Sequence, residues 1–390
     1  MKTIKEADLK GKKVLVRVDF NVPRDKERNI TDDTRIWAAI PTLQYMLDAG
    51  AALIVMSHLG RPKGKVSEEL SLDKVAVRFA EILGRNVAFA PDCVGDEVKK
   101  MAAALKPGEV MLLENLRFHA EEEKNVPEFA KELASLGDVF VNDAFGTAHR
   151  AHASTAGLAD YLPAYAGFLL DKEVTLLEKV MQNPDSPRMA ILGGAKVADK
   201  LGLIRNLLDK MDIILIGGGM ANTFLKAQGY EVGKSLCEYE LVGEATAIMQ
   251  LAKDKQRKLL LPIDVVTTTE LEDDAPANVK ELNEVPADEL IADIGPRTVA
   301  LYREEIAKAR SIVWNGPVGV FEKKPFMKGT EEIAKAVSTS GAFSLIGGGD
   351  SVSAVKKLHL QENISHISTG GGATLEYLEG KILPGVKVCQ

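Results

Sequence analysis

The stretches KVLVRVDF (residues 13–20) and SIVWNG (311–316) decide the fold class of this chain. Each is a short apolar run that ends in polar or glycine-containing sequence. Similar runs recur along the chain and alternate with segments of helical periodicity, such as residues 201–211. Apolar strands that alternate with helices are typical of parallel sheets in βαβ units. The sequence therefore predicts an α/β protein.

The predicted strands fall into two groups, which indicates two sheets. A helix over about residues 171–181, followed by a proline-containing turn, separates them and is predicted to connect two domains. The predicted strands are 13–20, 52–59, 110–118 and 139–145 in the first group, and 189–194, 212–219, 257–266, 311–316, 343–349 and 366–372 in the second.

The composition is that of an ordinary globular protein. The 390 residues, 46% hydrophobic and 27% charged, suffice for two cores. Because no long apolar run and no signal-like N-terminus are found, we expect no membrane span and a cytoplasmic location. The three scattered cysteines, and six histidines without HExxH or CxxC spacing, favour neither a disulfide framework nor a structural zinc. The net charge of −7 argues against a nucleic-acid partner.

Charged side chains follow the predicted strands of the first half. RVDFNVP (17–23) places Arg17, Asp19 and Asn21 at alternating positions, so an extended segment would point them to one side. Each residue alone is also consistent with a solvated charge or a turn. Their shared position beyond strand ends predicts a pocket for a small, multiply anionic substrate, because arginine forks bind phosphate and carboxylate. The other members are Arg35, His58, Arg61, Arg117, His149, Arg150 and His152.

Glycine follows the predicted strands of the second half. GGAKVADK (193–200) ends a strand and is predicted to open a helix, where backbone N–H groups can bind an anion and where Lys196 and Lys200 would share a face. In GGGDS (347–351), Asp350 is predicted at a helix N-cap; it is either simply a cap or a carboxylate that holds Mg²⁺ beside nucleotide phosphates. Glu322 follows a tight loop and can take ribose hydroxyls. The alternative for the lysines is exposure to solvent.

Two familiar nucleotide motifs are absent. The chain contains no GxGxxG, and GYEVGKS (229–235) has three residues instead of four between its glycines and follows a helix-like segment. The HRD and DFG motifs of protein kinases are also missing.

Nine motifs in fixed order, spread over residues 17–373, carry a family resemblance. They are RVDFNVP, SHLGRPKG, ENLRF, NDAFGTAHRAHAS, LGGAKVADK, IGGGMANTFL, WNGPVGVFE, GGGDS and ISTGGGA. Together they resemble phosphoglycerate kinases of the bacterial type. The resemblance implies two Rossmann-like three-layer (α/β/α) domains whose parallel sheets face each other across a cleft. It implies an acid-substrate domain over 1–170, a nucleotide domain over 171–374, and a segment, 375–390, that returns to the first domain.

The implied reaction is reversible phosphoryl transfer from 1,3-bisphosphoglycerate to Mg·ADP, giving 3-phosphoglycerate and ATP, by a monomeric glycolytic enzyme. The positions that match the family's acid site are Asp19, Asn21, Arg35, His58, Arg61, Arg117 and Arg150. Those that match its nucleotide site are Gly193, Lys196, Lys200, Gly217, Asn315, Glu322, Gly348, Gly349, Asp350 and Ser351. Arg35, Lys196 and the backbone of Gly348 and Gly349 match the groups that stabilise the moving phosphoryl group, and Asp350 matches the metal-associated carboxylate.

Two other functions remain open from the residues. A dinucleotide-dependent dehydrogenase is disfavoured by the missing GxGxxG and by the concentration of arginine. A non-catalytic nucleotide-binding protein would not need Lys196 and Arg35 on opposing domains.

Overall fold

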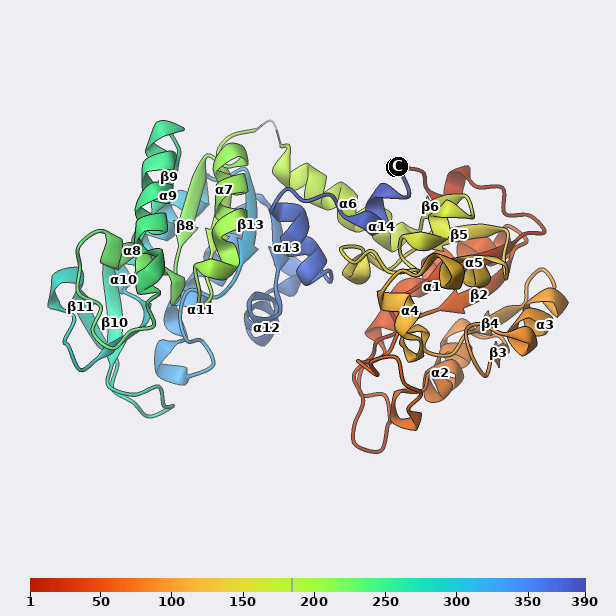
Figure 1. The fold of residues 1–390 in the computed structure, drawn as a ribbon. Coiled ribbons are helices and arrows are strands. Elements are labelled where there is room, and N and C mark those ends of the chain that lie inside the picture. Colours follow the sequence, from red (N-terminus) through yellow and green to blue (C-terminus); the bar gives the residue numbers. More distant parts are fainter. Residues whose placement is uncertain (184) are drawn as a thin grey trace. The chain divides into compact units, whose positions relative to one another are not determined.

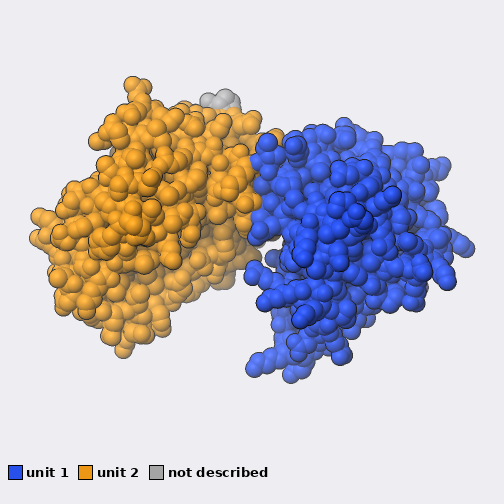
Figure 2. Space-filling model, viewed as in Figure 1, with its two compact units in different colours: residues 1–174, 382–390 blue, residues 175–381 orange. Residues whose placement is uncertain are grey.

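The computed structural model describes residues 1–183 and 185–390. The chain divides into two compact units (Figures 1 and 2). Unit 1 consists of Met1–Val174 and Ile382–Gln390, and unit 2 of Thr175–Lys381. These boundaries lie four and seven residues after the predicted limits at residues 170 and 374. No helix of the described residues is long and apolar enough to cross a membrane.

Unit 1 is built on a parallel sheet with the strand order β3-β4-β2-β1-β5-β6. Its strands are β1 (Lys13–Arg17), β2 (Ala52–Met56), β3 (Val87–Phe89), β4 (Val110–Leu112), β5 (Val139–Asn142) and β6 (Ala164–Ala166). Its helices are α1 (Thr34–Asp48), α2 (Asp73–Leu83), α3 (Asp96–Ala104), α4 (Ala120–Glu123), α5 (Pro127–Ala134) and the C-terminal α14 (Pro384–Lys387).

Both faces of this sheet are covered, which explains why its central strands are apolar throughout. Val14 and Val16 of β1 pack in one core cluster with residues of α1 and α2. Leu15 points to the other face and packs with residues of α3 and α5. Successive strand residues alternate between faces, so burial on both sides requires a continuous apolar run rather than an alternating one.

Unit 2 contains a second parallel sheet, with the order β15-β14-β13-β7-β8-β9. Its strands are β7 (Arg188–Leu192), β8 (Ile213–Ile216), β9 (Lys258–Leu260), β13 (Ser311–Asn315), β14 (Phe343–Gly347) and β15 (His366–Ile367). A small antiparallel sheet, β11-β10-β12, adds β10 (Asp264–Thr268), β11 (Asn278–Glu281) and β12 (Leu290–Ile294).

The remaining helices belong mainly to unit 2. They are α6 (Phe168–Met181), which spans the boundary between the units, and α7 (Leu201–Lys210), α8 (Met220–Ala227), α9 (Val242–Asp254), α10 (Pro296–Lys308), α11 (Lys328–Thr339), α12 (Gly349–Lys357) and α13 (Gly372–Leu378). Short 3-10 turns lie at Ile4–Glu6, Glu68–Leu70, Leu116–Phe118, Phe145–Thr147, Gly157–Asp160, Ala198–Lys200, Tyr239–Leu241, Leu282–Glu284, Lys324–Phe326 and Gln361–Asn363.

The prediction of two parallel sheets is confirmed, but one predicted strand is wrong. Residues 257–266 form parts of two strands in different sheets, β9 and β10, with Pro262 between them. Proline lacks the N–H needed to continue a ladder, so the run breaks there. Four strands were not predicted: β3, β6, β11 and β12. β3 and β6 have only three residues each, β11 alternates between half-buried and exposed residues, and Asp293 interrupts the apolar sequence of β12.

The C-terminal residues 382–390 pack within unit 1. The N–H of Gly385 donates to the carbonyl of Ala148 (2.8 Å), and Asn142 Nδ2 donates to the carbonyl of Gly385 (3.0 Å). The N–H of Lys2 donates to the carbonyl of Cys389 (2.6 Å), so the two ends of the chain are joined.

Candidate active site

The residues predicted for the acid site of unit 1 gather where the parallel strands end. Asp19 and Asn21 follow β1, His58 follows β2, Arg117 lies in the turn after β4, and Arg150 follows β5. These strands run parallel, so their carboxyl ends meet at one edge of the sheet. Arg35 reaches the same place from the first turn of α1.

Hydrogen bonds tie Asp19, Asn21 and Arg35 into one arrangement. Arg35 Nη1 donates to the carbonyl of Asn21 (2.6 Å) and lies 3.3 Å from Asp19 Oδ1. Asn21 Oδ1 accepts a hydrogen bond from the N–H of Gly60 (2.9 Å). This bond holds the loop that carries His58 and Arg61 next to Asn21. Arg117 Nη1 donates to the carbonyl of the same Gly60 (3.2 Å). The structure thus brings side chains from distant parts of the sequence around one loop.

His58 is held as a neutral hydrogen-bond donor. Its Nδ1 lies 3.1 Å from Nη2 of the fully buried Arg17. A guanidinium can only donate, so Nδ1 accepts and the ring proton resides on Nε2. Burial lowers the pKa of His58 well below its usual value, and the charges of Arg17, Arg117 and Arg35 lower it further. Sequence spacing placed Arg17 beside Asp19 and Asn21, but Arg17 is part of the buried support of His58.

The positive groups of unit 1 lie close enough to disfavour one another's charge. Burial lowers the pKa of Arg117, and the charges of Arg61 and Arg150 act in the same direction. Burial together with Arg117, Arg17 and Arg150 lowers the pKa of His152 to about 4. Arg35, Arg61 and Arg150 are exposed. Converging arginines of this kind are stabilised when an anion binds among them.

Glycines position the loops of unit 2. The N–H of Gly193, after β7, donates to the carbonyl of Asn315 (2.9 Å), and the N–H of Gly194 donates to that of Pro317 (3.0 Å). A Cβ at Gly193 would lie 2.0 Å from the Pro317 oxygen, and one at Gly217, after β8, would lie 2.6 Å from Val318 Cβ. Only glycine allows this approach of the loop that follows β13.

Three further predicted groups meet at the end of β13. Lys200 Nζ donates to Asn315 Oδ1, and burial lowers the pKa of Lys200. Asn315 Nδ2 donates to the carbonyl of Gly347 (3.2 Å). Ser351 Oγ, which is fully buried, accepts from the N–H of Gly316 (2.6 Å). These bonds join the ends of β13 and β14.

Two local predictions in unit 2 are wrong. Lys196 and Lys200 do not share a helix face, because Lys196 lies in an irregular, exposed segment and Lys200 ends a 3-10 turn before α7. Gly194, with φ of +107°, and the bonds to the Pro317 loop hold this segment out of a helix.

Asp350 is not the N-cap of α12. That position belongs to Gly348, whose φ of +92° favours glycine, and Asp350 is exposed in the first turn.

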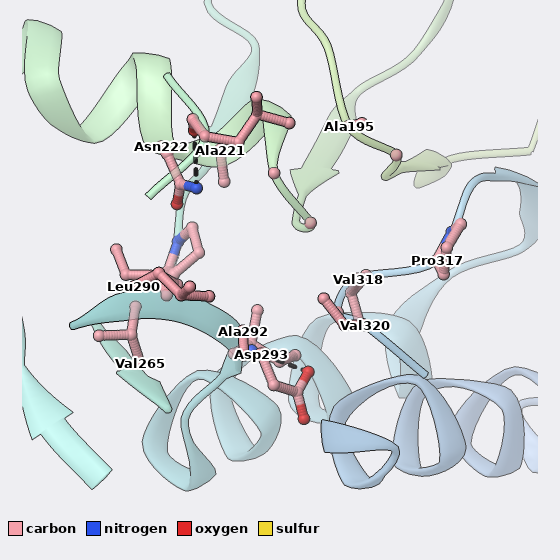
Figure 3. A pocket seen from close by; sticks show the side chains of 18 of the residues that line it. Ala195, Ala221, Asn222, Val265, Leu290, Ala292, Asp293, Pro317, Val318 and Val320 are labelled. Carbon is pink, nitrogen blue, oxygen red and sulfur yellow. Dashed lines mark hydrogen bonds between the residues drawn. The ribbon is translucent and has the colours of Figure 1, made fainter. Parts of the chain in front are cut away.

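A pocket of about 530 Å³ opens beside these loops (Figure 3). Its wall combines Gly194, Gly218 and Gly219 with apolar side chains from α8, β10 and β12 and the loop after β13. Of the predicted residues, Glu322 and Asp350 line it, whereas the other nucleotide-site candidates lie outside its lining. Its residues include Asn222, Leu225, Leu236, Val265, Leu290, Ala292, Asp293, Pro317, Val318 and Val320.

Sequence reasoning missed the antiparallel wall of this pocket and two buried polar residues, Asn222 and Asp293. Burial raises the pKa of Asp293 to about 8, although N–H groups of Ile294 (2.9 Å) and Gly329 (2.8 Å) donate to its carboxyl group. An aspartate inside the apolar run LIADI (290–294) was the available signal, since buried carboxyl groups need partners.

Comparison with known proteins assigns nearly the whole chain to one family. The family model described as phosphoglycerate kinase matches residues 4–381. The chain belongs to the phosphoglycerate kinase family. It is 59% identical to the phosphoglycerate kinase of Moorella thermoacetica over 384 residues, which cover 98% of each chain. It is 54% identical to that of Dictyoglomus turgidum, over 99% of this chain and 98% of the relative.

Solved phosphoglycerate kinase structures share this fold. That from Coxiella burnetii matches with a TM-score of 0.94 and 46% identity, over 99% of this chain and 98% of the other. That from Pyrococcus horikoshii matches with a TM-score of 0.79 and 36% identity, over 100% and 98%. The resemblance drawn from the sequence motifs is thereby confirmed, and so is the fold class.

Proposed function

We propose that this chain catalyses reversible phosphoryl transfer from 1,3-bisphosphoglycerate to Mg·ADP, giving 3-phosphoglycerate and ATP. This is a glycolytic reaction of a phosphotransferase whose acceptor is a carboxyl group. We further propose that it acts as a monomer in the cytoplasm, without a nucleic-acid or membrane partner. The observation that carries the proposal is the convergence of basic side chains at one sheet edge of unit 1, in a chain that matches the phosphoglycerate kinase family throughout.

The acid substrate is assigned to the basic edge of unit 1. Arg61, Arg117 and Arg150 supply positive charge for a phosphate, and Nε2–H of neutral His58 supplies a donor that needs no charge of its own. Asp19 and Asn21 offer acceptors for the substrate hydroxyl. Arg35 is already oriented by the carbonyl of Asn21 and is exposed, so it is free to meet the group in transfer.

The nucleotide is assigned to unit 2. Its base and ribose fit the apolar pocket, where Glu322 provides acceptors for ribose hydroxyls. Its phosphates are assigned to the glycine loops and the N-terminal end of α12, where the first backbone N–H groups lack partners within the helix. Gly193, Gly217, Asn315 and Ser351 hold these loops together, and Lys200 is fixed against Asn315.

The donor set at α12 fits Mg²⁺. Asp350 is an exposed carboxylate in the pocket lining, and Mg²⁺ prefers one or two carboxylates together with phosphate oxygens and water. When bound, the ion neutralises charge on the nucleotide phosphates. Asp350 would hold it there, beside the phosphates.

The main requirement of this reaction is that the protein stabilises the charge on the moving phosphoryl group. An acyl phosphate is already a good donor, so no side chain has to act as a nucleophile. We assign stabilisation of the moving phosphoryl group to Arg35, Lys196 and the backbone N–H groups at Gly348 and Gly349. Each such donor is typically worth about 3–4 kcal/mol in the transition state.

The two substrates have to approach each other for transfer. All the assigned acid-site residues belong to unit 1 and all the assigned nucleotide-site residues to unit 2. We therefore propose a hinge closure that both ligands together complete. Small-angle scattering with neither, one or both ligands tests this, and an unchanged radius of gyration with both would contradict it.

A coupled assay tests the function. Protein, 3-phosphoglycerate, ATP and Mg²⁺ are linked to glyceraldehyde-3-phosphate dehydrogenase, and NADH loss is followed. We expect turnover that EDTA abolishes. Absence of turnover while ADP and 3-phosphoglycerate each raise the melting temperature would instead indicate a binding protein.

A further inference from the structure

Glu122, on α4, is a fully buried glutamate that belongs to neither candidate binding site. Both of its carboxyl oxygens accept hydrogen bonds from Ser154, which is also fully buried. The N–H of Ser154 donates to Oε1 (2.8 Å), and the hydroxyl donates to Oε2 (2.6 Å). Glutamate is almost never fully buried unless it is paired, so a positive group is expected close to this carboxylate.

That positive group is the guanidinium of Arg17, which is fully buried as well. Its Nε donates to Ser154 Oγ (2.8 Å), so the serine hydroxyl links the guanidinium to the carboxylate. Burial lowers the pKa of Arg17 to about 10, and Glu122 is the strongest influence in the opposite direction. Removal of either partner would leave a buried charge without compensation, which is strongly unfavourable.

The direction of each hydrogen bond in this buried network is fixed. A guanidinium can only donate, so Ser154 accepts from Arg17 and gives its own proton to Glu122. The other two nitrogens of Arg17 donate to the carbonyl of Val18 (2.6 Å) and to Nδ1 of His58 (3.1 Å). Each nitrogen therefore has a different acceptor, which fixes the plane of the guanidinium and leaves the proton of His58 on Nε2.

We propose that Glu122 is a positioning residue for the acid substrate, because it holds Arg17 where Arg17 keeps the proton of His58 on Nε2. The inference rests on the proposed binding of 3-phosphoglycerate at the basic edge of unit 1. Without the contact from Arg17, the ring of His58 can carry its proton on Nδ1 instead. An unprotonated Nε2 is an acceptor and would repel an anionic ligand.

Steady-state kinetics of two variants in the coupled assay test this role. Ser154→Ala removes the link but leaves both charges in place, whereas Glu122→Gln removes the negative charge and keeps the size of the side chain. Each is expected to raise KM for 3-phosphoglycerate about tenfold, the effect of one hydrogen bond to a charged group. KM for ATP and kcat should change by less than about twofold, because the lost contact serves only the binding of the acid substrate.

Ser71→Ala is the matched control. Ser71 Oγ likewise donates to a buried glutamate of unit 1, Glu114 (2.6 Å), but that pair is separate from the bonds of Arg17. Its KM values should stay near those of the wild type. An unchanged KM for 3-phosphoglycerate in Ser154→Ala would overturn the inference. An equal rise of KM for both substrates would also overturn it, since that result indicates a general structural defect.

The tautomer of His58 tests the inference without any need for turnover. In protein with isotope-labelled histidine, NMR shows which ring nitrogen carries the proton, and the spectrum of His58→Ala identifies the signal. The wild type is expected to hold the proton on Nε2, and Ser154→Ala is expected to show a mixture of both tautomers. Retention of the Nε2 tautomer in Ser154→Ala would overturn the positioning role. Absence of turnover in the wild type, together with the expected change of tautomer, would instead overturn the proposed function and leave the restraint on His58 established.

Discussion

The two units share one architecture but present their binding groups in different ways. Each is a parallel sheet whose candidate ligand contacts follow the strand ends. In unit 1 these contacts are charged side chains, several of them exposed, supported from below by buried groups such as Arg17. In unit 2 many of them are backbone groups brought together where glycines let two loops touch, as at Gly193 and Pro317, and side chains such as Glu322 add to them.

This difference sets how each site should respond to mutation. A site made of exposed side chains loses affinity when one is removed, but its fold does not depend on that side chain. A backbone N–H group cannot be removed by truncating a side chain. One methyl group added to a closely packed glycine, however, displaces the loop that carries these N–H groups. The comparison therefore predicts that truncation of an exposed side chain changes function without loss of stability, whereas a methyl group added to a glycine loop of unit 2 lowers stability as well.

The largest effects are expected for Arg35 and Lys196, the two side chains that we propose to stabilise the moving phosphoryl group. Arg35→Ala and Lys196→Ala should each lower kcat by at least about a hundredfold, since each removes roughly 3–4 kcal/mol of transition-state stabilisation. Both side chains are exposed, so melting temperatures should stay near that of the wild type. The coupled assay at saturating substrate measures this.

Matched controls separate a specific role from general loss of positive charge. Arg85→Ala in unit 1 and Lys226→Ala in unit 2 remove surface cations engaged with Gly108 and Glu231 and should leave kcat nearly unchanged. If Lys196→Ala had a normal kcat, Lys196 would not stabilise the moving phosphoryl group. Of the groups assigned to that task in unit 2, only the backbone N–H groups would then remain.

The next effect is on stability and tests the role of glycine in unit 2. Gly193→Ala should lower the free energy of unfolding by about 1–3 kcal/mol and weaken ADP binding, because its Cβ would lie 2.0 Å from the Pro317 carbonyl oxygen. Denaturant unfolding and calorimetry measure the two effects. Gly243→Ala is the control: its Cβ meets no atom within 4 Å, and alanine favours the helix.

The same experiment on unit 1 completes the comparison. Arg61→Ala and Arg150→Ala should change the free energy of unfolding by less than about 0.5 kcal/mol while raising KM for 3-phosphoglycerate. If either arginine variant proved as destabilised as Gly193→Ala, the contrast between the units would fail.

The contrast also explains what the sequence could and could not predict. Both parallel sheets follow from apolar runs such as residues 13–17 and 311–315, because strands buried on both faces require them. The basic edge follows from the same runs, since charged residues directly after parallel strands must meet.

The pocket of unit 2 could be predicted only in part. Glu322 and Asp350 stand next to conspicuous glycine turns, but Leu290 comes from an antiparallel strand with no local signal of a site, and nothing distinguishes Asn222 from its neighbours within the motif IGGGMANTFL. The spacing of residues 17–23 also could not predict that Arg17 is buried and supports His58. Whether it faces solvent or His58 depends on Ser154, to which its Nε donates (2.8 Å) from 137 residues away. Such contacts arise from tertiary packing, and periodicity does not encode them.

A pH effect tests a buried carboxyl group that supports the strand ends of unit 1. Asp143 follows β5, and its Oδ1 accepts from the N–H of Leu169 (2.9 Å) at the start of α6. Burial raises the pKa of Asp143 to about 7, despite hydrogen bonds that lower it. The folded state thus retains this proton up to about pH 7, whereas the unfolded chain releases it near pH 4. Its contribution to stability is full below about pH 4 and is lost as pH rises through about 7.

Asp143→Asn should remove that dependence. Relative to the wild type, the variant should gain about 1–2 kcal/mol of unfolding free energy between pH 5 and pH 7, measured by urea unfolding at each pH. The exposed aspartate Asp8 gives the control Asp8→Asn, whose profile should run parallel to that of the wild type. A parallel profile for Asp143→Asn as well would mean that Asp143 is ionised in the folded protein.

The smallest expected effect concerns the one side chain in unit 2 that is assigned to the metal. Asp350→Ala should raise KM for Mg·ADP roughly fivefold, because Mg²⁺ keeps phosphate and water ligands when one exposed carboxylate is lost. KM for the acid substrate should change less than twofold, since its assigned contacts all lie in unit 1. If Asp350 acts through the metal, the defect should shrink as free Mg²⁺ is raised. Asp288→Ala, an exposed aspartate outside the pocket, should show neither change. A defect in Asp350→Ala that is independent of Mg²⁺ would assign this carboxylate to the nucleotide itself, and side chains would then contribute more to nucleotide binding in unit 2 than its glycine loops alone imply.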